Sequence, residues 1–477
     1  MCGCPVIAST CAAQMELVDH EEALFHSDDA ETLGDKLEAL LLKPALRESL
    51  AASQAHLGPK FREEAVGQRF WGPLELAADN IRHGTVTGKA RKPRLAFLSP
   101  YPPDPCDAAK YTAFAIEAGK AWFDSDIYTD AARPLEFGGA FPDEGAISLA
   151  PLLDKRYEGV ISVLGNFVSS NKILEVFEHY GGPCILHDIR LTPIYYERLG
   201  PEGFRQFAER LLNRHVSKEE VHGWLQDPNP TSLFVERVIN RASPLMVHSL
   251  KQQALLRKRY AVDSHVLTCC PTLTLLEEEL TVAARQAARE RLGVRPDTFL
   301  IASFARQNGV YEMATCILAL ELLRSWNMAA ELYLVGNTVS VAAELRSVCD
   351  QSDLTSYVRY GDEFSGDAAY RDFLIAADAA VQLQPYGFGQ PPVALTNCIC
   401  AGLATVANQD AAESCDAPAY VGKVIDAFSP LLVAERLALI WGARTADVSR
   451  AEARAGYLET HNFGYYARRL IEILGVV

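Results

Sequence analysis

The stretch from Val381 to Asn408, VQLQPYGFGQPPVALTNCICAGLATVAN, constrains the fold more than any other part of the sequence. It begins as an apolar strand, enters a loop that contains Gly387 and Gly389, and reaches a pair of prolines. Glycine lets a backbone approach a ligand closely and proline suits the first turn of a helix, so the stretch predicts strand, tight loop and helix in that order. An apolar helix, a closing Gly402 and a second apolar strand follow, as in a buried parallel sheet.

Free amide groups at the start of this helix, with the positive end of the helix dipole behind them, would suit a phosphate or diphosphate. The glycine spacing alone does not distinguish such a site from an ordinary turn of an α/β sheet, and both interpretations stay open at this point. The order of residues over the whole stretch indicates a particular kind of site more specifically than the glycine spacing does.

This stretch resembles the donor-site segment of the family 4 glycosyltransferases, in which a Glu precedes G-F-G-x-P and a second Glu follows eight positions after the first. Phe388, Pro391 and both glycines fall where that pattern has them. Tyr386 and Ala394 stand at the two glutamate positions. In the family those carboxylates hold the sugar and the ribose of the nucleotide-sugar, so the resemblance implies a donor site with altered polar contacts.

The resemblance covers nearly the whole chain and implies the GT-B architecture. This is an α/β fold class with two Rossmann-like, doubly wound lobes that face a cleft. The alternation of apolar strands with helices supports two such lobes from the residues themselves. We assign residues 93–275 to an N-terminal, acceptor-side lobe and residues 276–477 to a C-terminal lobe that binds the nucleotide-sugar donor.

Residues 1–88 are interpreted as a partial α/β remnant, the C-terminal end of an upstream glycosyltransferase lobe. Residues 3–9 match residues 402–408 at an offset of 399, and helices follow in both copies. A chance likeness between two α/β segments is the alternative interpretation. A related expectation is that Met1 is an internal methionine of a longer tandem enzyme.

Candidate catalytic residues lie in the first of the two lobes. His187 and Asp188 follow a strand, where the ligands of open α/β sheets collect. The resemblance places them at an L-H-D motif that faces the cleft. His187 can accept or donate a proton near neutral pH, and a hydrogen-bonded structural histidine is an equal alternative.

Candidate donor-binding residues lie in the second lobe. The resemblance implies that an arginine after the first strand holds the donor diphosphate together with the loop amides, and that the residue before the loop stacks on or bonds the donor. Where the family has a lysine five residues after that arginine, this sequence has Tyr311, which removes one positive charge. The donor-binding candidates are Arg306, Tyr386, Gly387, Phe388, Gly389 and Gln390.

Charge and length limit the partners of the chain. The formal net charge of -16 and the pI near 5.2 argue against a nucleic-acid partner, which requires clustered positive charge. No apolar run approaches the roughly 18 residues that a membrane-spanning helix needs, and no signal peptide is recognised. We therefore expect a cytoplasmic protein.

No metal site and no cofactor beyond the nucleotide-sugar substrate are expected. The close cysteine pairs lack the repeated spacing of a zinc site. Asp124 and Asp126 form a D-x-D, which lies at the start of a strand and is interpreted as part of a solvated loop.

A basic helical run contains Arg205, Arg210, Arg214 and His215. It is interpreted as a solvated helix face, and a surface for an acceptor or for peripheral contact with the inner membrane is the alternative.

The sequence therefore predicts a metal-independent glycosyltransferase. It would transfer a sugar from a nucleoside-diphosphate sugar to a glycan or lipid-linked acceptor of the cell envelope or an exopolysaccharide, with retention of configuration. The alternative is a catalytically degenerate, glycosyltransferase-like scaffold or partner subunit, which the residues at positions 311, 386 and 394 favour.

Overall fold

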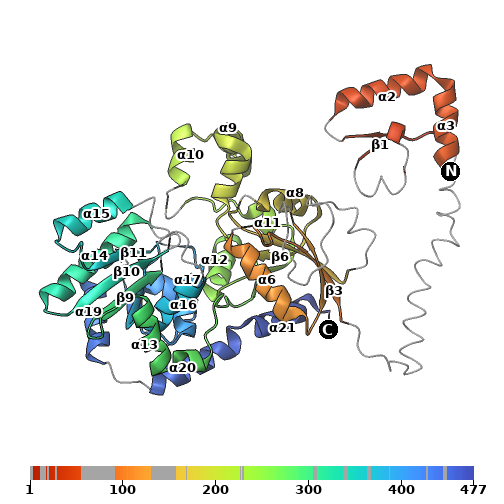
Figure 1. Cartoon of the computed structure of the whole chain (residues 1–477). Helices are drawn as coiled ribbons and strands as arrows, with labels where there is room; N and C mark the ends of the chain where they lie inside the picture. The colour runs from red at the N-terminus through yellow and green to blue at the C-terminus, as the bar shows by residue number, and fades with distance from the viewer. Residues whose placement is uncertain are drawn as a thin grey trace, which may run out of the picture. The chain divides into compact units, whose positions relative to one another are not determined.

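The computed structural model separates the chain into two compact units, the first within residues 1–92 and the second from Pro93 onward. The second unit contains both predicted lobes (Figure 1). The structure describes residues 4–10, 18, 21–26, 29–54, 92–104, 106–129, 157–167, 169–225, 227, 230–304, 309–336, 342–361, 367–385, 387–425, 428–443 and 448–476.

The first unit is a two-stranded parallel sheet with two helices. Asp29 caps the first long helix, as its sequence predicts, because its side chain accepts a hydrogen bond from the Thr32 amide. The small core consists of Ala8, Val18, Ala23 and Leu50. The elements are β1 (Ala8–Ser9), η1 (Glu21–Ala23), β2 (Leu24–Phe25), α2 (Ala30–Leu42) and α3 (Pro44–Gln54).

The acceptor-side lobe is a six-stranded parallel sheet in the order β4-β3-β5-β6-β7-β8. The central strands β3 and β5 are largely apolar and buried, which is typical of parallel sheets with helices on either side. The strands are β3 (Arg94–Leu98), β4 (Asp124–Tyr128), β5 (Gly159–Leu164), β6 (Gly182–Leu186), β7 (Ala242–Val247) and β8 (His265–Val266). The helices are α6 (Asp107–Gly119), α8 (Ser170–Tyr180), α9 (Thr192–Leu212), α10 (Lys218–Trp224), α11 (Glu236–Ile239) and α12 (Leu250–Tyr260).

The donor-side lobe is a second six-stranded parallel sheet, in the order β11-β10-β9-β12-β13-β14. When β9 is numbered as the first strand of this sheet, the order becomes 3-2-1-4-5-6, which is that of the Rossmann fold. The strands are β9 (Phe299–Phe304), β10 (Ala330–Val335), β11 (Val358–Tyr360), β12 (Ala379–Gln382), β13 (Thr405–Asn408) and β14 (Gly422–Val424). The helices before the loop at residue 387 are η2 (Glu277–Leu280), α13 (Val282–Arg291), α14 (Val310–Ser325), α15 (Ala342–Gln351) and α16 (Asp367–Ala376).

The stretch on which the sequence prediction was built has the predicted order. β12 leads into the loop, and α17 (Val393–Cys400) is buried from Leu395 onward, as its apolar sequence predicts. Gly402, with a φ of 65°, ends the helix before β13. The remaining helices are α18 (Gln409–Ser414), α19 (Pro430–Gly442), α20 (Val448–Thr460) and α21 (Phe463–Leu474).

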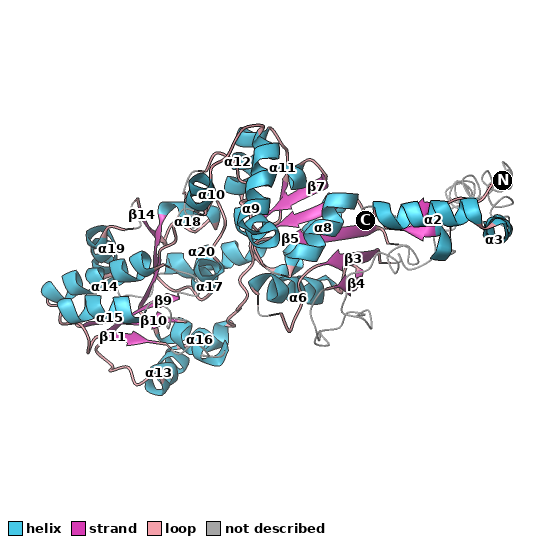
Figure 2. Cartoon of the chain, turned by 90° about the horizontal axis from the view of Figure 1, so that it is seen from above, coloured by secondary structure: helices cyan, strands magenta, loops and turns pink. Residues whose placement is uncertain are grey.

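The last helix connects the lobes. α21 leaves the donor-side lobe and packs against α6 of the acceptor-side lobe (Figures 1 and 2). Tyr466 and Leu470 of α21 lie in the same buried cluster as Phe97 and Tyr111. Burial of this apolar face stabilises the pair of lobes as one unit.

The sequence prediction for Asp126 was wrong. The Asp126 side chain is buried, not solvated, and both of its oxygens accept hydrogen bonds from Arg94 at 2.9 and 3.1 Å. Tyr157 also donates to this carboxylate. Asp126 therefore belongs to a structural ion pair between the neighbouring strands β3 and β4, in which Arg94 lies diagonally across the sheet from it. Asp124, the other member of the D-x-D, is exposed as predicted.

A buried ion pair provides a test of the donor-side lobe. Asp378 accepts hydrogen bonds from Arg285 and Arg289 of α13 at 2.7 and 3.1 Å, and from the Leu300 amide of β9 at 2.8 Å. Arg289 is buried, so replacing Asp378 by Ala leaves a charge without its partner. We expect a loss of about 3 kcal/mol in the free energy of unfolding, measured by urea denaturation.

Asp372→Ala is the matched control, because Asp372 pairs at 2.5 Å with the exposed Arg291. That exposed pair is expected to contribute less than about 1 kcal/mol. Equal losses in the two variants would contradict the assigned role of Asp378.

Candidate functional site

The candidate site is built where the carboxyl ends of acceptor-side strands meet the glycine loop of the donor-side lobe. His187 and Asp188 follow β6 directly, as predicted. The His187 amide donates to the Leu164 carbonyl oxygen at the end of β5, at 2.8 Å, which fixes the backbone at this edge. His248 and Ser249 follow β7, the next strand of the sheet.

Asp188 is held by the acceptor-side lobe. Its Oδ2 atom accepts a hydrogen bond from the Asn166 amide at 2.8 Å. Burial raises the pKa of Asp188 above its ordinary value, and the hydrogen bond from Asn166 opposes that shift because it stabilises the ionised form. Asn166 is itself oriented by its bond to the Arg190 carbonyl oxygen at 2.7 Å.

His187 and His248 lie against each other, with ring centroids 4.4 Å apart. Tyr111 packs edge-on against both rings, at 5.5 and 5.4 Å. His248 Nδ1 lies 3.0 Å from the Leu267 carbonyl oxygen, so Nδ1 carries the proton of the neutral ring, and the buried Nε2 has no hydrogen-bond partner. The pairing of His248 with His187 arises only when β6 and β7 become neighbours, which no local sequence pattern specifies.

Both histidines are uncharged at neutral pH. Burial lowers the pKa of His248 to about 4, and the hydrogen bond to Leu267 only partly opposes this. Burial also holds the pKa of His187 well below its ordinary value, and the neighbouring His248 lowers it further. His187 therefore presents a neutral imidazole, which can accept a proton or a hydrogen bond.

The glycine loop rests on the acceptor-side lobe. Gly389 has a φ of 78°, and a Cβ at this position would lie 2.8 Å from the Gln252 amide nitrogen and from Lys251 Cβ. Ser249 donates a hydrogen bond to the Gly389 carbonyl oxygen. The sequence analysis explained Gly389 by close approach to a ligand; in the structure the approach is to the backbone at the start of α12.

Neighbouring side chains extend this contact between the lobes. Phe388 is buried, and the Arg190 guanidinium lies over its ring at 5.4 Å from the centroid. Lys251 pairs with Asp410 at 2.6 Å and with Glu413 at 2.9 Å. Sequence analysis did not identify Arg190 or Lys251, because neither position belongs to a recognisable local motif.

The loop amides differ in one respect from the predicted anion site. The Gln390 amide donates to the Gly387 carbonyl oxygen at 3.0 Å, so it is not free for a ligand. The other two predicted donor-binding residues, Arg306 and Tyr386, lie outside the described residues.

A buried carboxylate stands at the start of α14. Glu312 is buried, its Oε2 atom has no hydrogen-bond partner among the described residues, and a Cβ at Gly309 would lie 2.7 Å from that atom. Gly309 is the N-cap of α14 and Glu312 occupies the third helical position, where a carboxylate interacts favourably with the helix dipole. Negative charge is therefore already present at this helix end.

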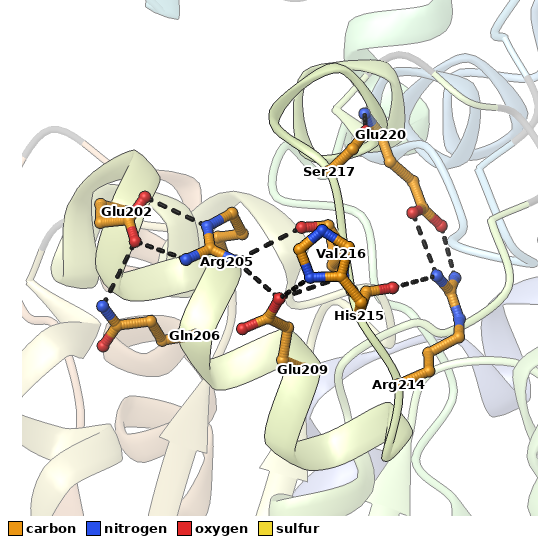
Figure 3. Close-up of polar contacts among 9 residues, drawn as sticks. All are labelled: Glu202, Arg205, Gln206, Glu209, Arg214, His215, Val216, Ser217 and Glu220. Atoms are coloured by element: carbon orange, nitrogen blue, oxygen red, sulfur yellow. Dashed lines mark hydrogen bonds and ion pairs between the residues drawn. The ribbon is translucent and has the colours of Figure 1, made fainter.

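The basic run, on α9 and in the turn that follows it, is largely paired with acidic side chains (Figure 3). Arg205 bonds to Glu202 and Glu209, both at 2.6 Å, and His215 Nδ1 lies 2.7 Å from Glu209. Arg214 pairs with Glu220 in the same way. This pattern agrees with the predicted solvated face, because paired charges offer little net attraction to anionic lipids.

Within the described residues there is no group of three or more metal-binding side chains. None of the described helices is both long enough and apolar enough to cross a membrane.

Comparison with known proteins rests on structure alone. No protein-family model and no curated protein sequence matches the chain. Anabaena HepE, solved in complex with UDP-glucose, superposes over 81% of this chain and 100% of its own, with a TM-score of 0.53 and 14% identity. WaaG, a glycosyltransferase involved in lipopolysaccharide biosynthesis, covers 80% of this chain and 100% of its own, with a TM-score of 0.51 and 15% identity.

The chain has the GT-B fold. A third structure, the sucrose-phosphate synthase of Thermosynechococcus elongatus, covers 80% of this chain and 98% of its own, with a TM-score of 0.50 and 16% identity. The predicted pair of Rossmann-like lobes is thereby confirmed. At these identities the likeness establishes the fold and leaves the substrate to be argued from the site.

The adjacent buried rings of His187 and His248 predict a specific dependence of stability on pH. A histidine whose pKa is lower in the folded than in the unfolded state binds more protons when unfolded, so stability is lost as the pH falls below about 6.5. For His248, with a folded-state pKa of about 4, the loss between pH 7.5 and pH 5 is expected to be about 2 kcal/mol.

Urea denaturation at the two pH values checks this expectation, with His248→Phe as the variant. The variant should lose about 2 kcal/mol less than the wild type between the two pH values. The exposed His222→Phe serves as the control and should keep the wild-type dependence. A His248→Phe variant with the full wild-type dependence would show that His248 is not buried in its neutral form.

Proposed function

We propose that the chain is a glycosyltransferase that takes a sugar from a nucleoside-diphosphate sugar bound by the donor-side lobe and passes it to an acceptor bound by residues 93–275. The observation that carries this proposal is the contact of the glycine loop with residues that follow the acceptor-side strands. Ser249 donates to the Gly389 carbonyl oxygen, and Gln252, whose amide a Cβ at Gly389 would meet, donates to the His187 carbonyl oxygen at 3.2 Å. Open α/β sheets bind ligands at the carboxyl ends of their strands. HepE, which shares the fold, was solved with UDP-glucose.

In this proposal each lobe supplies different chemistry. Arg306 and the loop amides of Gly387 and Gly389 would stabilise the leaving diphosphate, with Tyr386 against the donor. The neutral His187 would contact the acceptor hydroxyl or the transferred sugar, and Asp188 would accept hydrogen bonds from sugar hydroxyls. No metal is required in this proposal, because the positive charge of Arg306 and the amide dipoles of the loop would stabilise the leaving diphosphate.

We further propose a cell-envelope or exopolysaccharide acceptor, glycan or lipid-linked, and transfer with retention of configuration. WaaG, which acts in lipopolysaccharide biosynthesis, supports the acceptor class by its shared fold. The ten cysteines within the described residues are all free thiols, which supports a reducing compartment such as the cytoplasm.

A scaffold or partner subunit without turnover is the second candidate. It is favoured by the loop contacts, since Ser249 occupies the Gly389 carbonyl oxygen and Phe388 is buried beneath Arg190. The buried Glu312 at the start of α14 also opposes a second anion at that helix end. In this reading the glycine loop serves to join the lobes.

We also propose that the first unit is a partial copy of the donor-side lobe. In β1 and β2, Ala8 lies opposite Leu24; in β13 and β14, Ala407 lies opposite Lys423. The residue numbers of both members of this pair differ by 399 between the two sheets. The spacing of the two strands along the chain and their register are therefore the same in both. A 13-residue helix follows in each case, α2 or α19. This agreement supports the repeat that the sequence suggested.

Calorimetric titration with UDP, GDP, ADP and dTDP tests the enzymatic proposal. One nucleotide should bind with micromolar affinity, and Arg306→Ala should weaken it at least tenfold, because a charge-assisted hydrogen bond to a phosphate contributes roughly 1.5–3 kcal/mol. The exposed Arg468→Ala is the control and should bind as the wild type does.

The same titration separates the two candidate functions. Absence of binding by every nucleotide at millimolar concentration would contradict the glycosyltransferase and favour the scaffold. Equal affinity of a nucleotide for the wild type and for Arg306→Ala would show that Arg306 does not bind the donor. The proposal that the donor-side lobe binds a nucleotide would still stand.

A further inference from the structure

Gln252 occupies a helix-capping position but bonds beyond its own helix. It is the third residue of α12 after the N-cap Ser249, whose hydroxyl accepts a hydrogen bond from the Gln252 amide at 3.0 Å. In a capping box, a glutamine at this position would bond back to the amide of the N-cap residue itself. Here its Oε1 atom accepts instead from the amide of His248, one residue earlier, at 2.8 Å. The side chain therefore holds the backbone that follows β7.

The same side chain also holds the neighbouring strand end. Gln252 Nε2 donates to the carbonyl oxygen of His187, which follows β6, at 3.2 Å. Because β6 and β7 are adjacent in the sheet, one amide group ties the backbones of both histidines together. The side chain is fully buried, and both of its polar atoms are thereby paired. These two bonds fix the points from which the imidazole rings extend, and the ring centroids lie 4.4 Å apart.

Gln252 also lies against the glycine loop. A Cβ added at Gly389 would lie 2.8 Å from the Gln252 amide nitrogen. The Ser249 hydroxyl, which accepts from this amide, donates in turn to the Gly389 carbonyl oxygen. A continuous series of hydrogen bonds thus runs from the loop through Ser249 and Gln252 to the backbones of both histidines. A ring that Gln252 holds in place is held relative to the loop as well.

The chemistry of glutamine suits this position. The side chain must donate to a carbonyl oxygen and accept from an amide at the same time, and a carboxamide does both without charge. Gln252→Glu would keep the acceptor for His248 but lose the donor to His187. Gln252→Met, of similar length and flexibility, would lose both bonds. The two substitutions therefore remove different parts of the contact while leaving the backbone of α12 unchanged in sequence.

We infer that Gln252 is a positioning residue, which sets the His187 ring against that of His248 so that His187 meets the acceptor hydroxyl or the transferred sugar in a fixed orientation. This inference rests on the proposed function for the role of His187. Gln252 is fully buried, so it acts through the two histidines and not on the substrate itself.

The first test measures the geometry of the histidine pair without substrate. In deuterated protein with protonated histidine, the wild type should show a nuclear Overhauser effect between the rings of His187 and His248. The His187→Phe and His248→Phe variants assign the signals. Gln252→Met should lose this effect, because both ties between the backbones are removed. Gln252→Glu should lose it as well, because His187 is released.

The matched control is the next residue of the same helix. Gln253 donates a hydrogen bond to the Ser264 carbonyl oxygen, so Gln253→Ala also removes one side-chain bond of α12. This variant should keep the wild-type effect between the rings. An unchanged effect in Gln252→Met or in Gln252→Glu overturns the inference, and the second variant serves if the first does not fold.

The second test uses turnover of the nucleotide-sugar that the wild type binds. Gln252→Met should lower kcat about tenfold while KM for the donor changes less than about threefold, because the ring that meets the acceptor is misplaced. Gln253→Ala should keep both constants. A loss of thermal stability with kcat per folded molecule unchanged would mark Gln252 as merely structural and overturn the inference.

The two proposals fail in different ways. Absence of nucleotide binding by the wild type contradicts the glycosyltransferase and leaves the measurement on the histidine rings standing. An unchanged effect between the rings in Gln252→Met overturns the role of Gln252 whatever the chain binds.

Discussion

The close approach of the Gly389 backbone to the start of α12 is the contact on which the joined site depends. A Cβ added at Gly389 would lie 2.8 Å from the Gln252 amide nitrogen of the other lobe, so the contact has no room for a side chain larger than hydrogen. The Ser249 hydroxyl and the Lys251 ion pairs then hold the two elements in register. Without this contact, the glycine loop and the strand ends at His187 and Asp188 would belong to two separate surfaces.

The chemistry of the site follows from its position between the lobes. Burial keeps His187 and His248 neutral and raises the pKa of Asp188. A neutral imidazole beside a fixed carboxylate suits the binding of sugar hydroxyls, which both donate and accept hydrogen bonds. The same contact is also compatible with the second candidate function, a scaffold without turnover, because Gly389 joins the two lobes whether or not a donor binds.

Much of the fold could be predicted from the sequence because it depends on local patterns. The strand, loop and helix around Gly387 follow from apolar runs and glycine conformation, and the placement of His187 at a strand end follows from sheet periodicity. The partner of Gly389 and the stacking on His248 depend on which strands become neighbours, which no local pattern specifies. Asp126 was misassigned for the same reason, because its partner Arg94 is 32 residues away.

Hydrogen–deuterium exchange of the first turn of α12 in Gly389→Ala tests the central contact most directly. The alanine Cβ would meet the Gln252 amide, so the loop should leave α12 and exchange over residues 249–256 should accelerate at least about tenfold. Gly442→Ala, at a position with no atom within 4 Å of the added Cβ, should exchange as the wild type does. Unchanged exchange in Gly389→Ala would contradict the account, because the lobes would then be joined without this contact.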